Sequence, residues 1–77
     1  MKIGNNLRRC RFDKDELSQE ALAEAVGVTR QTILSIEKGK FVPSTLLALK
    51  LARFFNKSVE EIFYLIDDEK KKDDQKN

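Results

Sequence analysis

The sequence predicts an all-α fold of five helices in one small domain. Gly and Pro together account for four of the 77 residues, and no run of β-branched residues alternates as a strand would. Hydrophobic residues make up 40% of the chain, which is enough for one packed core, and the length leaves no room for a second.

The first helix is predicted over residues 2–13. Ile3, Leu7 and Cys10 recur at positions i, i+4 and i+7, which is the spacing of a buried helical face. We therefore expect Cys10 to be a packed thiol rather than a redox sensor. Residues 13–16, Asp-Lys-Asp-Glu, are polar and aperiodic, so they predict a loop.

The second and third helices follow one another closely. Ser18 is a good N-cap for the second helix, which Gly27 ends. Thr29 caps a third helix, 29–38, only two residues later, and Gly39 ends it. The two helices must therefore meet at a steep angle, as in a helix-turn-helix. A small residue at the crossing and apolar residues in the corner fit this arrangement: Leu22, Ala23, Val26, Val28, Ile33 and Ile36.

Hydroxyl caps also predict the last two helices. Pro43 disfavours helix at the preceding residue, and Ser44 then caps the fourth helix. Ser58 and Glu61 form a capping box for a fifth helix that ends at about Ile66.

Residues 62–66, Ile-Phe-Tyr-Leu-Ile, would cover the full circumference of that helix. One small core cannot bury them all, unless the short helix is sunk deeply into it. We expect a homodimer interface that includes Phe63 and Tyr64. The domain is expected to span residues 1–66, and the polar residues 67–77 a disordered tail.

Composition excludes several functions. The chain has no His and one Cys, which removes an internal disulfide, a cysteine metal cluster and a Ser-His-Asp triad. We therefore expect no enzyme, no metal and no cofactor. No apolar run is long enough for a membrane span or typical of a signal peptide, so we expect a cytoplasmic protein without a membrane partner.

Charge is distributed in bands along the chain. Residues 30–57 carry six basic residues against the single acidic Glu37, so an anionic partner is sought there. Arg8, Arg9, Lys50 and Arg53 are interpreted as solubility charges outside the site.

The third helix has two different faces. Ile33 and Ile36 fall on its inward arc, and the outward arc carries five residues: Arg30, Gln31, Leu34, Ser35 and Lys38. Arg suits guanine, Gln suits adenine, Leu suits a thymine methyl and Ser is an adaptable donor and acceptor. Thr29 and Lys38, at the helix ends, are placed to contact phosphates.

The stretch LSQEALAEAVGVTRQTILSIEKGKFVPS, residues 17–44, resembles the helix-turn-helix of the phage Cro and repressor type, the XRE family of transcriptional regulators. The resemblance runs from about Ile3 to Tyr64. It implies a five-helix lambda-repressor-like DNA-binding domain, with the helix-turn-helix at helices 2 and 3 and the third helix in the major groove.

The resemblance also implies roles for individual residues. The first Gln of helix 2 contacts phosphate and braces the recognition helix in this family, which points to Gln19. The Lys after the helix-ending Gly lies near the DNA backbone, which points to Lys40. Base reading falls to three recognition-helix residues: Arg30, Gln31 and Ser35.

An Arg late in helix 1 pairs with the recognition-helix Glu in this family, so Arg11 and Glu37 are expected to form a structural ion pair. Two features depart from the commonest family pattern. The loop before Leu17 is one residue longer, and Ala21 stands where many members have the Glu of a capping box.

These expectations describe a sequence-specific regulator of transcription, a repressor, that binds double-stranded DNA as a homodimer on an inverted repeat. No small-molecule effector is expected. The alternative is an antitoxin-like or other protein-interaction module with secondary DNA binding. Because only a polar tail follows the fifth helix, we expect no toxin-binding extension, which favours the first hypothesis.

Overall fold

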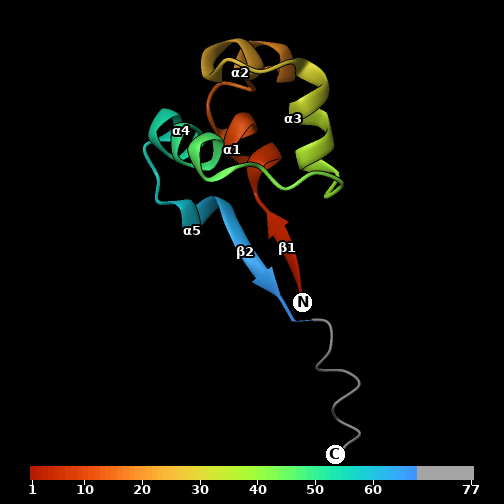
Figure 1. Ribbon diagram of the computed structural model, residues 1–77. Coiled ribbons are helices and arrows are strands. Elements are labelled where there is room, and N and C mark those ends of the chain that lie inside the picture. The colour runs from red at the N-terminus through yellow and green to blue at the C-terminus, as the bar shows by residue number, and fades with distance from the viewer. Residues whose placement is uncertain (68–77) are drawn as a thin grey trace, which may run out of the picture.

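The computed structural model describes residues 1–67, which form five helices and a two-stranded antiparallel sheet (Figure 1). The helices are α1 (Leu7–Asp13), α2 (Gln19–Val26), α3 (Arg30–Glu37), α4 (Thr45–Phe55) and α5 (Val59–Ile62). The strands are β1 (Lys2–Asn5) and β2 (Phe63–Ile66). The five predicted helices and the helix-turn-helix are confirmed, and the domain is helical as predicted, but it also contains a small two-stranded sheet that was not predicted. The predicted tail spans residues 67–77, and all of it except Asp67 lies outside the described residues.

The sheet is a narrow ribbon that extends away from the helices, with the N-terminus at its far end (Figure 1). Lys2 lies opposite Ile66, and Asn5 lies opposite Phe63. The predictions that the first helix begins at residue 2 and that the fifth continues to residue 66 are therefore wrong. The apolar and aromatic residues of β2 suit a pleated strand, and Gly4 weakens any helix through β1.

Two asparagines connect the ribbon to the helices. The side-chain oxygen of Asn5 accepts the backbone N–H of Leu7 at 3.0 Å, at the start of α1. Its amide nitrogen donates to the carbonyl of Ile36 at 2.9 Å, and the amide of Asn6 donates to the carbonyl of Glu61 at 3.1 Å. Asn5 and Asn6 thus begin α1 and tie it to α3 and α5.

The predicted hydroxyl caps begin four helices. The side chains of Ser18, Thr29, Ser44 and Ser58 each accept a backbone N–H three residues later. The predicted capping box is complete, because Glu61 also accepts the backbone N–H of Ser58 at 2.7 Å. At the other end of α2, Gly27 has a φ of 78°, which a residue with a side chain rarely adopts.

The core lies where α1, α2, α3, α4 and α5 converge. Its largest fully buried side chains are Leu7, Leu22, Ile33, Ile36, Leu51 and Ile62. The predicted corner between α2 and α3 is confirmed, with Ala23 3% exposed where the two helices pack and Val28 partly buried beside it. Cys10 is buried as expected, and burial raises the pKa of its thiol.

Candidate nucleic-acid interface

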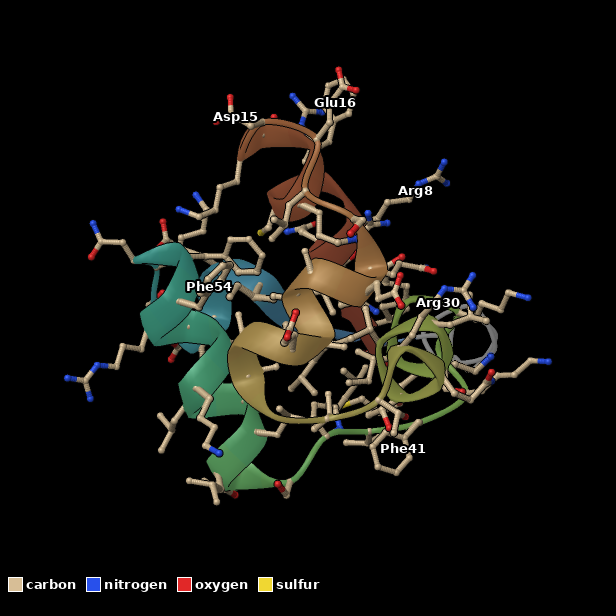
Figure 2. The ribbon with its side chains drawn as sticks, turned by 90° about the horizontal axis from the view of Figure 1, so that it is seen from above. Arg8, Asp15, Glu16, Arg30, Phe41 and Phe54 are labelled. Atoms are coloured by element: carbon tan, nitrogen blue, oxygen red, sulfur yellow. The ribbon has the colours of Figure 1, made fainter. Side chains whose placement is uncertain are left out.

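Helix α3 has one face buried in the core and one face accessible to solvent. Ile33 and Ile36 are 0% and 1% exposed in the core. Arg30, Gln31 and Lys38 are exposed, and Leu34 and Ser35 are half-buried. Arg30 extends outward from the side of the molecule where α3 lies (Figure 2). The predicted outward arc is therefore accessible along its length.

Two residues of this arc contact each other. The amide nitrogen of Gln31 lies 3.4 Å from the hydroxyl of Ser35, one turn further along α3. A bond of that length is weak and readily exchanged for a better partner. The second N–H and the carbonyl oxygen of Gln31 remain available, which is the donor and acceptor pair that adenine requires.

A part-buried ion pair fixes α3 against α1. Arg11 donates from Nε to Oε2 of Glu37 at 2.6 Å and from Nη2 to Oε1 at 3.0 Å. The two side chains are 15% and 7% exposed. Gln19 donates to Oε1 of Glu37 at 3.1 Å, so it braces α3 from the start of α2. The predicted Arg11–Glu37 pair therefore forms.

The longer loop before Leu17 does not disturb this pair. Arg11 also donates from Nη1 to the carbonyl of Leu17 at 2.8 Å, which fixes the end of the loop. Asp15 and Glu16 both have left-handed backbone, with φ values of 56° and 55°. They turn the chain tightly and so accommodate the additional residue. The loop therefore reaches α2 without moving Gln19 away from Glu37.

A model of the helix-turn-helix family matches residues 7–62, which include all five helices. The chain belongs to the XRE-type helix-turn-helix family. The family consists of DNA-binding transcriptional regulators, and membership implies double-stranded DNA as the partner.

Curated relatives of this XRE-type protein come from archaea and bacteria. One from Methanocaldococcus jannaschii is 57% identical over 53 residues, which cover 69% of this chain and 80% of the relative. One from Bacillus subtilis is 58% identical over 48 residues, or 62% and 73% of the two chains. One from Archaeoglobus fulgidus is 50% identical over 56 residues, or 73% and 79%. Each is named an uncharacterised HTH-type transcriptional regulator.

The remaining predicted contacts of this XRE-type domain lie at the ends of α3. Thr29 caps its start, and Lys38 is the exposed C-cap. Gly39 follows with a φ of 76° and turns the chain, and Lys40 donates its backbone N–H to the carbonyl of Ser35 at 2.9 Å. Both lysine side chains are exposed beside the C-terminal end of α3.

Arg8, which the sequence alone assigns to solubility, lies beside α3. Together with Arg11, Gln19, Leu34, Glu37 and Lys38 it lines a hollow of about 270 Å³ between α1 and α3. The signal was present in the sequence, because Arg8 precedes Arg11 by three residues and so shares its helical face.

The two residues predicted at a dimer interface differ in their burial. Phe63 is 9% exposed and belongs to the core, whereas Tyr64 on β2 is 43% exposed. The argument from a helix that is apolar all round is wrong, because residues 63–66 form a strand. Phe63 is therefore not available on the surface of the protomer.

Two further observations bear on function. Within residues 1–67, no helix is both long and apolar enough to cross a lipid bilayer. In the same part of the chain, no group of three or more His, Cys, Asp or Glu side chains lies together in a position to hold a metal ion.

Proposed function

We propose that this regulator is a sequence-specific repressor that reads the DNA major groove with α3. The observation that carries the proposal is the division of α3 into a buried apolar face and an accessible arc of base-reading side chains. Its orientation supports the proposal too, because Glu37 is held by Arg11 and Gln19 from two other helices. A recognition helix fixed in this way presents its side chains to DNA without reorganisation.

Arg30, Gln31 and Ser35 carry the specificity in this proposal. Arg30 is long, exposed and able to donate twice to guanine, and Gln31 can pair with adenine. Leu34 lies between them on the arc and suits a thymine methyl group. Leu34 is half-buried, so its side chain does not extend far from α3. It can reach a thymine methyl group only if α3 itself lies in the major groove.

Gln19, Thr29, Lys38 and Lys40 contact the DNA backbone in this proposal. They lie at the start of α2 and at the two ends of α3, where the phosphates on either side of the groove pass. Such contacts set the register and most of the affinity, which falls as salt rises. Repression follows from occupancy, because a bound protein excludes other proteins from the same DNA.

An apolar surface supports a homodimer. Val42, Leu46 and Leu49 are 60%, 64% and 54% exposed, and we refer to these three residues as the α4 face. Val42 and Leu49 line a hollow of about 220 Å³ together with Ile3. Ile3 also lines a smaller hollow with Tyr64, so the apolar surface continues from the α4 face to the ribbon.

A second copy of the chain is the partner that this surface fits. The α4 face begins three residues after Gly39, which follows the end of α3. We place the two-fold axis at this face, with the two recognition helices on the same side of the dimer. Exposed apolar clusters of this kind mark association surfaces. Tyr64 is retained in the interface, whereas Phe63 is buried in the core of the protomer.

Selection of bound duplexes from a random library tests the proposal. We expect an inverted repeat whose half-sites are centred about 10 base pairs, or one turn, apart. Enrichment of no sequence would contradict a sequence-specific regulator. Retrieval of one stoichiometric protein partner from a lysate, by a protein with no preference among duplexes, would favour the protein-interaction alternative.

A further inference from the structure

The hollow between α1 and α3 contains one carboxylate, that of Glu37, and its charge is compensated by neighbouring side chains. Both carboxylate oxygens of Glu37 accept hydrogen bonds, from Arg11 at 2.6 and 3.0 Å and from Gln19 at 3.1 Å. The negative charge of Glu37 is therefore compensated within the protein. The charges that remain unbalanced around this hollow are those of Arg8 and Lys38.

Arg8 is available to an external anion. Its side chain is exposed, and among residues 1–67 no carboxylate is paired with it. The next residue differs in this respect, because Arg9 donates to both oxygens of Asp13 at 3.1 and 3.2 Å. Arg8 extends from the same side of the molecule as Arg30 (Figure 2).

Lys38 and Gln19 complete the lining. Lys38 is exposed at the C-cap of α3, on the opposite wall from Arg8. A primary amide has two N–H groups, and Gln19 uses one of them on Glu37, so the second can donate to a ligand. Two cations and one amide donor around a polar hollow are suited to a single oxyanion.

We propose that this hollow holds one phosphodiester of bound DNA, with Arg8 as a backbone contact supplied by α1. The inference rests on the proposed function, since it takes α3 to lie in the major groove. A hollow of about 270 Å³ admits a phosphate group together with ordered water. Leu34 and Lys38 belong both to the arc of α3 and to this lining, so DNA that meets the arc also brings its backbone to the hollow.

The contact fixes register and adds affinity without reading sequence. A phosphate is present beside every base pair, so Arg8 strengthens binding to every duplex equally. It also adds a DNA contact on α1 to those on α3. The Arg11–Glu37 pair joins these two helices, so the contacts keep a fixed geometry relative to one another.

Salt titration of three variants tests the inference. Fluorescence anisotropy is measured for Arg8→Gln, Arg8→Lys and the matched control Arg9→Gln, on a duplex selected by the unaltered protein and on a scrambled duplex. We expect Arg8→Gln to make the plot of log K against log salt shallower by about 0.9 for each protomer bound. At low salt it weakens binding to both duplexes by the same factor, on the order of tenfold.

The other variants separate charge from structure. Arg8→Lys keeps the positive charge and is expected to retain the original slope, and Arg9→Gln is expected to retain it because Arg9 is already paired with Asp13. An unchanged slope in Arg8→Gln, or an equal change in Arg9→Gln, overturns the inference.

Two more outcomes distinguish this inference from the proposed function. If the unaltered protein selects a duplex and Arg8→Gln leaves the slope unchanged, the phosphodiester contact is wrong and the proposed function stands. If the unaltered protein selects no duplex, the proposed function is wrong, and the inference that rests on it is wrong as well. Competition by inorganic phosphate at constant ionic strength that disappears in Arg8→Gln would support the inference, because phosphate and DNA would then share the hollow.

Discussion

Arg11 and Glu37, 26 residues apart in the chain, form an ion pair of two hydrogen bonds between α1 and α3. The pair joins α1 to the recognition helix, and both side chains are largely removed from solvent. Gln19 shares the same carboxylate, so three of the five helices meet at Glu37. Glu37 therefore helps to fix the orientation of α3, together with the buried side chains of Ile33 and Ile36.

We expect Glu37→Ala to destabilise the protein strongly. It leaves the part-buried Arg11 guanidinium without its counter-charge, a loss that approaches the roughly 3–5 kcal/mol of a fully buried pair. Urea unfolding measures this loss. The double variant Arg11→Met with Glu37→Leu is expected to recover most of the stability, because neither charge is then buried. A loss below about 1 kcal/mol in Glu37→Ala would mean that the pair behaves like a surface salt bridge.

Gly4 and Tyr64 provide a test of the ribbon. A Cβ at Gly4 would overlap the ring of Tyr64, its direct partner across the sheet, and would lie 2.8 Å from the side chain of Ile66. We therefore expect Gly4→Ala to displace the ring and destabilise the ribbon, although alanine is otherwise the better strand residue. Tyrosine fluorescence reports this directly, because the chain has one Tyr and no Trp.

The matched control for the ribbon is a Tyr64→Ala background. Without the ring, most of the obstacle to a side chain at Gly4 is removed. Gly4→Ala is therefore expected to cost little stability in that background. An equal cost with and without the ring would show that Tyr64 does not cover Gly4.

The parts of the fold that sequence predicted depend on local chemistry. Ser18, Thr29 and Ser44 each accept an N–H three residues ahead, so the start of a helix is visible in a short window of sequence. Gly27 is visible for the same reason, since its left-handed backbone is a property of one residue.

The ribbon depends on a partner far along the chain. Ile3 pairs with Leu65, and neither strand has an internal signal for that register. The spacing of Ile3, Leu7 and Cys10 therefore imitated one continuous helix. Within the site, the Arg11–Glu37 pair followed from family resemblance. The spacing of Arg8 and Arg11 places them on one helical face, but the position of that face beside α3 depends on how α1 crosses α3.

The α4 face predicts the effect of a charge on association. Leu46→Glu would place a carboxylate in the apolar interface of a homodimer, and we expect it to shift the protein to monomer in sedimentation equilibrium. Phe12→Glu is the matched control, because Phe12 on α1 is 61% exposed and lines a different hollow, which contains no residue of the α4 face. If the two variants had the same proportion of dimer, the α4 face would not be the dimer interface.

The capping box of α5 predicts a dependence on pH. The hydrogen bond from the Ser58 backbone lowers the pKa of Glu61 below its ordinary value of 4.5. A lowered pKa contributes stability that is present above pH 4.5 and is lost as pH falls through the folded value. We expect the advantage of the native residue over Glu61→Gln, measured by urea unfolding, to shrink as the solution is acidified. An advantage independent of pH would contradict this role for the carboxylate.

Base reading by α3 is the central claim, and duplex selection with single-residue variants tests it most directly. Arg30→Ala and Gln31→Ala are each expected to lose preference at one base pair of each half-site, at a cost of about 1–3 kcal/mol, and to keep the rest of the motif. Arg53→Ala, on α4, is expected to select the unaltered motif. If Arg30→Ala and Gln31→Ala also select the unaltered motif with undiminished affinity, α3 does not read the bases.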